Sequence, residues 1–240
     1  MRALSASELL GVWERGLQAE PITRAMELLS EACPEMDGDS LSGLTIGQRD
    51  GLLLRLREWT FGPHVTALAA CAACGERIEL GFRSADLLGP EPALEASLAM
   101  DGFTLRLRPP TTSDLAAASH PDLARARVEL LERCVLAAHY LEAPVETAQL
   151  PDAVLDAAER CLAEADPQAD ISVAVACPAC GARHAVAFDV VSYFWREIEA
   201  WAVRIFRDVH TLATAYGWSE REILALSPLR RQCYLDLVGT

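Results

Sequence analysis

The sequence contains no lysine, so its 21 basic residues are all arginines. Acidic residues outnumber them at 35, which gives a formal net charge of −14. Proteins that bind nucleic acids neutralise phosphates with clustered Lys and Arg side chains. The densest basic clusters here, Arg230-Arg231 and the alternating Arg55 and Arg57, are too small for that role. We therefore expect no nucleic acid partner.

Long apolar runs are also missing. No stretch reaches the roughly 18 apolar residues that a membrane span requires, so we expect no such span. The first residues, MRALSASELLGVWERG, are interrupted by Glu8 and Glu14 and do not resemble a signal peptide. These absences indicate a protein of the reducing cytoplasm. In that compartment, paired cysteines more often bind metals or perform redox chemistry than form structural disulfides.

Sequence motifs of catalysis are missing as well. There is no phosphate-binding glycine loop, no G-x-S-x-G and no H-E-x-x-H. Acidic residues fall on the surfaces of predicted helices, where solvation explains them. We therefore expect no enzymatic activity. Single cysteines and histidines on predicted helices are interpreted as core or core-edge residues, namely Cys33, Cys134, Cys161, Cys233, His139 and His210.

Helical and strand patterns are both present in the 240 residues, of which 51% are hydrophobic. Capping boxes predict helices that begin after Ser5 and after Thr45. The dipeptide Asp101-Gly102 predicts a tight hairpin turn between two strands. A broad apolar stripe predicts a long helix from about Val191 to Tyr216. The expected fold class is α+β, mostly α-helical, with a small antiparallel β element that resembles a zinc ribbon.

These elements predict five segments along the chain. They are an N-terminal helical segment at 1–63, a first cysteine turn with a β-hairpin at 64–110, a helical insertion at 111–168, a second cysteine turn at 169–190, and a C-terminal helical segment at 191–240. Within the insertion, the stretch SDLAAASHPDLARARVELLERCVLAAHYLEA has helical spacing and precedes an acidic helix, PDAVLDAAERCLAEADP.

One cysteine-containing motif occurs twice. CAACGERIELGF begins at Cys71, and CPACGARHAVAF begins at Cys177. Both copies contain Cys-x-Ala-Cys-Gly-x-Arg and end in phenylalanine, at Phe82 and Phe188. Apolar residues alternate with polar or small ones after each copy, and before the second, which is typical of half-buried strands. Each cysteine turn is therefore predicted to connect two strands.

A Cys-x-x-Cys-Gly turn between strands is typical of a zinc knuckle, which supplies two thiolates. A structural zinc ion needs four ligands. His64 and His184 lack the usual finger spacing and are not equivalent between the copies. The economical solution is one structural Zn²⁺ per chain, with the two turns related by a local pseudo-two-fold axis. The predicted metal ligands are Cys71, Cys74, Cys177 and Cys180.

Two other interpretations of the cysteine pairs remain open. A thioredoxin-type redox pair often has proline inside it, and Pro178 lies inside the second pair. Such a pair sits at a helix N-terminus, however, whereas both pairs here lead into strands. Two unrelated pairs of buried cysteines are the other possibility, although the matched flanking residues favour a shared site.

The C-terminal stretch FDVVSYFWREIEAWAVRIFRDVHTLATAYGWSEREILALSPLRRQCYLDLV supports a family resemblance. It resembles small proteins encoded with contractile phage tails and phage-tail-like injection systems, related to the baseplate hub assembly chaperones of T-even phages. The markers are His-x-Leu-Ala-x-x-Tyr from His210 to Tyr216, then Gly-Trp-Ser-Glu and an arginine-rich final helix. The segments SELLGVWERGL and IGQRDGLLLRLREWTFGP, with the cysteine turns, look similar to the same group, whereas the acidic middle does not.

This resemblance implies a non-enzymatic assembly chaperone or structural component of a baseplate hub. Its partners would be baseplate or hub proteins, and it would be cytoplasmic or incorporated in an assembled tail-like particle. The final helix, with Leu229, Arg230, Arg231 and Tyr234, is the expected binding surface, since Arg and Tyr are enriched at binding hot spots. The alternatives are a zinc-ribbon regulator of transcription or translation, acting through protein contacts, and a thiol oxidoreductase.

Overall fold

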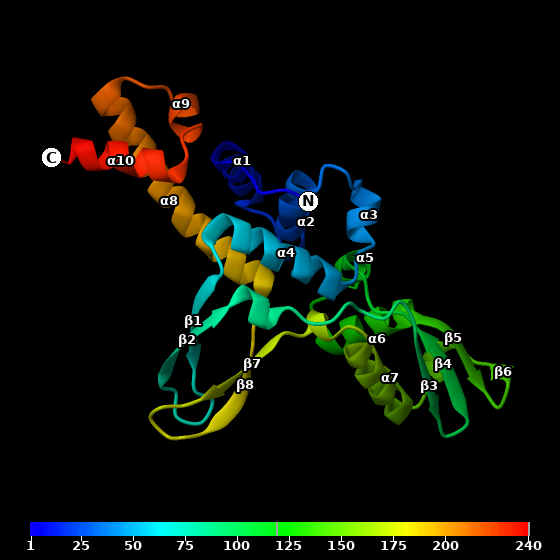
Figure 1. Ribbon diagram of the computed structural model, residues 1–240. Coiled ribbons are helices and arrows are strands. Elements are labelled where there is room, and N and C mark those ends of the chain that lie inside the picture. Colours follow the sequence, from blue (N-terminus) through cyan, green and yellow to red (C-terminus); the bar gives the residue numbers. More distant parts are fainter. Residues whose placement is uncertain (119, 240) are drawn as a thin grey trace. The chain divides into compact units, whose positions relative to one another are not determined.

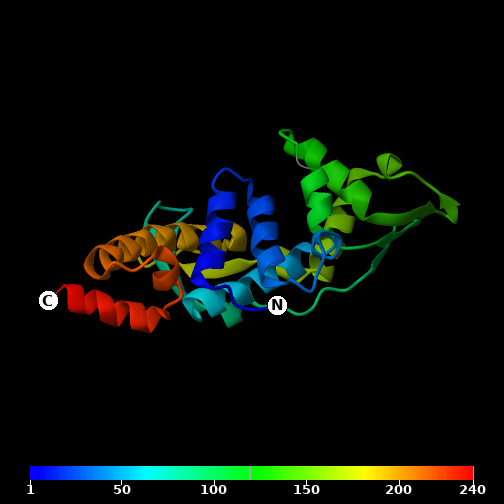
Figure 2. The ribbon, with the colours of Figure 1, turned by 90° about the horizontal axis from the view of Figure 1, so that it is seen from above.

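A computed structural model describes residues 1–118 and 120–239 of the chain (Figure 1, Figure 2). Internal contacts divide the described chain into two compact units. Unit 1 combines residues 1–36 with the residues from Val190 onward, and unit 2 contains Asp37–Asp189. Unit 1 is thus assembled from two distant parts of the sequence, and unit 2 is inserted between them.

The described part of unit 1 is helical. Its helices are α1 (Ala6–Gly16), α2 (Pro21–Ala32), α8 (Val190–Tyr216), α9 (Glu220–Leu224) and α10 (Pro228–Val238). The predicted capping box between Ser5 and Glu8 begins α1, and the predicted long apolar helix is α8. Figure 2 shows α1 and α2 side by side, and α10 alongside α8.

The core of unit 1 forms where α1, α2 and α9 pack on α8. Trp195 of α8 is 2% exposed, and a Cβ atom added to Gly16 of α1 would lie only 2.2 Å from its ring. The guanidinium of Arg24 lies over the same ring, 4.6 Å from the centroid. Farther along these helices, Leu10 and Ile205 form a separate buried cluster with Ala202 and Leu224. The absence of a side chain at Gly16 therefore permits the close contact between α1 and α8.

The described residues of unit 2 form helices and three separate small sheets. Its helices are α3 (Gly38–Ser42), α4 (Ile46–Phe61), α5 (Thr112–Ala117), α6 (Leu123–Cys134) and α7 (Asp152–Ala165), with short 3-10 helices η1 (Ser84–Leu87), η2 (Thr147–Gln149) and η3 (Pro167–Ala169). Helix α4 begins at the predicted Thr45 capping box, and Gly62 caps its C-terminal end. The φ angle of Gly62 is +90°, which favours glycine at this helix end.

A four-stranded antiparallel sheet lies at one end of unit 2. Its strand order is β3 (Ala96–Met100), β4 (Phe103–Leu107), β5 (Val135–Tyr140) and β6 (Ala143–Pro144). Asp101 and Gly102 connect β3 to β4 with φ angles of 50° and 82°, which confirms the predicted hairpin turn. Helix α7 packs on β3 and β4, and its Val154 joins Leu105 and Leu107 in a buried cluster (Figure 1).

The helical spacing predicted through SDLAAASHPDLARARVELLERCVLAAHYLEA is wrong at the end of that stretch. Helix α6 ends at Cys134, and the following residues form β5 and β6. Strand β5 pairs with β4, where Ala138 lies opposite Leu105. Without β5, one edge of β4 would leave its backbone groups unpaired beside a buried cluster, which is unfavourable. Strand pairing therefore outweighs the helical propensity of the alanine-rich and leucine-rich segment.

The predicted fold class is confirmed, since the chain is α+β and mostly α-helical with small antiparallel sheets. Among the helices in the described residues, none has both the length and the apolar character that crossing a membrane requires.

Candidate metal centre

Two β-hairpins of unit 2 carry the repeated cysteine turns. The first pairs β1 (His64–Ala70) with β2 (Arg77–Arg83), and the second pairs β7 (Ser172–Ala176) with β8 (Arg183–Ala187). Each cysteine turn connects the two strands of its hairpin, as the sequence predicts. Figure 1 shows the two hairpins side by side at one end of unit 2, coloured cyan and yellow.

The two turns have matching backbone geometry. In the first, the N–H of Gly75 donates to the carbonyl of Cys71 at 2.8 Å, and in the second Gly181 donates to Cys177 at 2.9 Å. The φ angles of these glycines are +76° and +73°. Residues with a Cβ atom rarely adopt this conformation, so the glycine after each Cys-x-x-Cys is explained by the turn. The repeated sequence thus encodes a repeated local structure.

The inner faces of the hairpins pack against each other. Four buried side chains form a small shared core, namely Cys71, Ile78, Val175 and Cys177. The rings of Phe82 and Phe188 meet edge to face, with centroids 5.5 Å apart. An isolated two-stranded hairpin is only marginally stable in water. The pairing of the hairpins therefore supports both turns and brings their cysteines together.

The four cysteine sulfurs form a compact cluster. The Sγ of Cys71 lies 3.7 Å from that of Cys180, and the Sγ of Cys74 lies 3.7 Å from that of Cys177. All four sulfurs lie within 4.8 Å of one another and could hold a metal ion. Zinc–sulfur bonds of about 2.3 Å in a tetrahedron would place sulfurs about 3.8 Å apart, whereas a disulfide needs about 2.05 Å. The spacing fits shared metal coordination and not disulfide bonds.

The cluster has the symmetry of its two turns. Exchanging the turns converts the Cys71–Cys180 pair into the Cys177–Cys74 pair, and both pairs have the same separation. The first cysteine of each turn is buried, at 3% and 2% exposure, and the second is exposed. This arrangement agrees with the local two-fold relation that the sequence repeat suggests.

The metal-free cluster cannot easily carry four negative charges. Backbone N–H groups of Cys74 and Ala73 favour the Cys71 thiolate and lower the pKa of Cys71 to about 6. The N–H of Glu76 also favours the thiolate of Cys74. The sulfur of Cys180, desolvation by burial, and the sulfurs of Cys177 and Cys71 together outweigh this hydrogen bond and raise the pKa of Cys74 to about 12. Full deprotonation therefore calls for a cation between the sulfurs.

The histidines considered in the sequence analysis stand apart from this cluster. Neither His64 nor His184 belongs to it, as the spacing argument expects. His139, predicted to be on a helix, lies instead on β5, and His210 is exposed on α8.

The single cysteines only partly match their prediction as core residues. Cys33 and Cys134 are buried, at 1% and 0% exposure. Cys161 is half-buried, and Cys233 is exposed on α10, so the core interpretation of Cys233 is wrong. Helix α10 has several exposed side chains, and nothing in its sequence compels Cys233 to face inward.

The predicted binding surface on α10 needs one correction. Leu229 is 75% exposed, and Arg230 is exposed, as expected. Arg231, however, is 6% exposed, and its Nε lies 3.3 Å from an oxygen of Asp208 in α8. Tyr234 is half-buried, with its ring packed against Trp218 and Tyr216. Arg231 therefore ties α10 to its own unit and is unavailable to a partner.

Sequence reasoning missed a buried polar site in unit 2. Asp166 is 1% exposed and Gln168 is 4% exposed, on either side of Pro167. The segment AEADPQAD looks like the polar end of an acidic helix, and its composition carries no signal of burial. The burial of Asp166 and Gln168 is explained only by their contacts with residues that are distant in the sequence.

Comparison with known proteins gives a match to a protein family. A family model described as T4 bacteriophage base plate protein matches residues 6–195. The matched range spans most of the chain, includes both cysteine turns, and ends inside α8, before α9 and α10. Searches of curated proteins and of solved structures found no match.

Proposed function

Because the chain belongs to the T4 bacteriophage base plate protein family, we propose that it is a non-enzymatic assembly chaperone or structural component of a baseplate hub in a contractile, phage-tail-like injection system. A single structural zinc ion would hold its two cysteine hairpins together. The observation that carries this proposal is the family match, whose range contains the whole four-cysteine cluster.

The sulfur geometry supports a structural zinc site. Separations of 3.7 Å match the edges of a zinc–thiolate tetrahedron. Four protein ligands complete that tetrahedron, so the site has no open position at which a water or substrate could react. A thiolate-bound iron would share this geometry. Elemental analysis of natively purified protein is expected to give about one zinc per chain, and iron in its place would overturn the zinc assignment.

The cysteine environment disfavours a thiol oxidoreductase. The thiol with the lowered pKa, Cys71, is 3% exposed, and both cysteine pairs lie between strands. Reactive redox cysteines are accessible and commonly lie at helix N-termini. A zinc-ribbon regulator remains the alternative if no baseplate protein binds the chain.

Exposed apolar residues of α10 are the proposed contact with a hub protein. Leu229 and Leu237 are 75% and 65% exposed on this helix. Large exposed aliphatic side chains contribute to binding when a partner removes them from water. The double variant Leu229→Ser, Leu237→Ser should reduce co-purification with baseplate hub proteins. Leu123→Ser is the matched control, since Leu123 is 83% exposed on α6 of unit 2.

Two outcomes separate the parts of this proposal. If the α10 variant captures hub proteins as well as the unmodified chain does, the contact surface is wrong. If the unmodified chain captures no baseplate component, the hub role itself is wrong. Mass spectrometry of purified tail particles then distinguishes a structural component, which is retained, from a chaperone, which is absent from the finished particle.

A further inference from the structure

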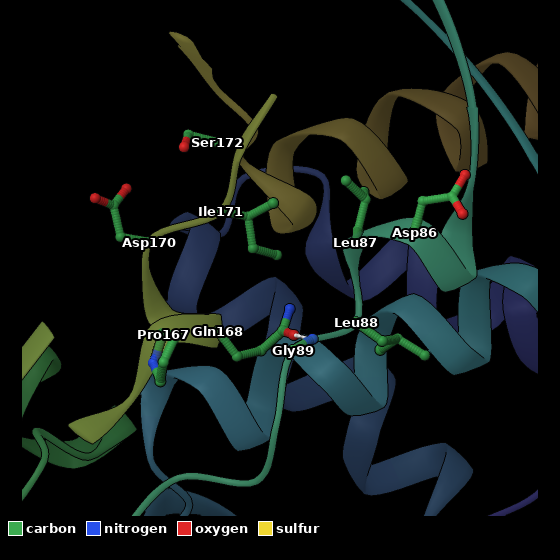
Figure 3. Close-up of a pocket in the computed structure, with 9 residues that line it drawn as sticks. All are labelled: Asp86, Leu87, Leu88, Gly89, Pro167, Gln168, Asp170, Ile171 and Ser172. Atoms are coloured by element: carbon green, nitrogen blue, oxygen red, sulfur yellow. Dashed lines mark hydrogen bonds between the residues drawn. The ribbon is translucent and has the colours of Figure 1, made fainter. Parts of the chain in front are cut away.

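A small hollow in unit 2 lies away from the cysteine cluster. Residues from two segments line it, 86–89 after β2 and 167–172, which lead into β7 (Figure 3). Its volume is about 220 Å³. Apolar side chains of Leu87, Leu88 and Ile171 form part of its wall. Both segments belong to the same compact unit, so the hollow is a local feature of that unit.

A buried amide group supplies the most informative contact in this hollow. Gln168 is 4% exposed, and its Oε1 accepts a hydrogen bond from the backbone N–H of Gly89. This bond identifies the other amide atom as the nitrogen. That nitrogen, Nε2, is buried and has no hydrogen-bond partner among the described residues. In Figure 3 it points away from Gly89, toward the space between Ile171 and Leu87.

The position of Gln168 is held by a second buried contact. Asp166, two residues earlier, is 1% exposed and accepts a hydrogen bond of 2.9 Å from the N–H of Gly47 at the start of α4. A Cβ atom on Gly47 would lie 1.9 Å from the Asp166 carboxylate, so only glycine fits there. The 3-10 helix η3 is thus anchored at both sides of Pro167. An anchored donor loses little freedom when it binds an acceptor.

The hollow selects its ligand by size and charge. Pockets for drug-sized molecules are about 300–1,000 Å³, so this hollow suits one or two amino-acid side chains better than a nucleotide cofactor. The ionisable residues among those that line it are both acidic, Asp86 and Asp170, and both are exposed at its rim. They repel anions and attract cations. The unpartnered donor of Gln168 requires an acceptor such as a carbonyl oxygen.

We propose that this hollow binds an extended peptide segment of a partner protein. A main-chain carbonyl of the segment accepts a hydrogen bond from Gln168 Nε2, and an apolar side chain packs on Leu87 and Ile171. An adjacent Arg or Lys of the segment pairs with Asp170 or Asp86. The inference concerns peptide chemistry and does not depend on the proposed baseplate role.

Peptide titration of the ¹⁵N-labelled full chain, with its metal as purified, tests this site. The probes are two blocked tripeptides, acetyl-Gly-Leu-Arg-amide and its charge-reversed counterpart acetyl-Gly-Leu-Glu-amide. The arginine peptide should shift the side-chain amide signal of Gln168 and the backbone signal of Gly89. The glutamate peptide should bind about tenfold more weakly, the change expected when one charge pair is lost.

Rim variants make the test specific. Asp170→Asn should weaken binding of the arginine peptide several-fold, because it removes a rim charge and keeps the side-chain shape. Asp101→Asn is the matched control, since Asp101 lies in the β3–β4 turn, where asparagine tolerates the positive φ. No shift at Gln168 and Gly89, equal binding of both peptides, or equal effects of the two variants would each overturn the proposal.

Discussion

Removal of the proposed zinc ion is expected to loosen the two cysteine hairpins while the rest of unit 2 stays folded. Ordering the backbone of turns 71–76 and 177–182 costs roughly 12–24 kcal/mol at about 1–2 kcal/mol per residue. Burial of Ile78 and Val175 in the shared core contributes about 3–6 kcal/mol. This apolar contribution alone falls short of the ordering cost.

The free energy of zinc binding is large enough to offset the part of the ordering cost that apolar burial leaves uncompensated. Apparent binding free energies of structural zinc in small domains are about 10–16 kcal/mol near neutral pH. Other contacts stabilise the rest of unit 2. They include the buried hydrophobic cluster beneath α7 and the buried hydrogen bond from the N–H of Gly47 to Asp166. Chelation should therefore release residues 64–83 and 172–187 selectively, without global unfolding.

Hydrogen exchange measured by mass spectrometry checks this expectation. With excess chelator, amides of β1, β2, β7 and β8 should exchange much faster, while amides of β3, β4 and β5 keep their protection. Cys74→Ser and Cys180→Ser should produce the same pattern without chelator, since both residues are exposed and their replacement leaves no cavity. Cys233→Ser is the matched control, because Cys233 is exposed and lies outside the cluster.

Hairpin protection that stays unchanged under chelation, although the zinc content falls to zero, would contradict this expectation. An equal loss of zinc in Cys233→Ser and Cys74→Ser would contradict it as well. In the first case the hairpins are held by their apolar contact, and in the second the metal is not bound by the cluster.

Two further predictions concern stability. In α1, Gly16→Ala should lower the free energy of unfolding by about 1–3 kcal/mol through collision with the Trp195 ring. Gly11→Ala should instead raise the free energy of unfolding by up to about 1 kcal/mol, because a Cβ atom there meets only the end of the Arg15 side chain, at 3.5 Å. Denaturant titration that finds equal effects would contradict this packing. For Asp114, burial acts to raise the pKa, but hydrogen bonds from Arg108 and Thr111 prevail and lower it from 3.8 to about 2. A carboxyl with a depressed folded-state pKa stabilises the protein above pH 4, and this contribution is lost as pH falls toward 2. Asp114→Asn should therefore cost roughly 1–2 kcal/mol at pH 7 and much less near pH 2, and an equal loss at both pH values would refute the ion-pair account.

Local sequence signals predicted much of the fold. The capping box at Ser5 and the turn at Asp101-Gly102 depend on contacts within a few residues, so the sequence contains the complete signal. The four-cysteine cluster was predictable for a different reason. Two matched half-sites imply one full site when the metal requires four ligands. The expectation of a phage baseplate protein is likewise confirmed at the level of the family.

Features that depend on distant contacts were not predictable. Residues 135–140 are compatible with a helix in isolation and become β5 because β4 lies beside them. Arg231 looks like a surface arginine until Asp208 of α8 is seen to pair with it. Gln168 looks like a polar loop residue until Gly89 is found to donate to it. In each case a partner remote in the sequence determines the environment of the residue.

The division of unit 1 between two distant stretches has a consequence for synthesis on the ribosome. The apolar side of α1 is covered by residues such as Ile205 and Leu224, which emerge long after Leu10. Unit 2 is continuous and can fold while translation proceeds, since domains generally fold as units during synthesis. The apolar surface of residues 1–36 therefore stays exposed to solvent until the whole of unit 2 and most of α8 have been synthesised. Completion of unit 1 is therefore a late, non-local step, and its high contact order makes it slow relative to the helices that compose it.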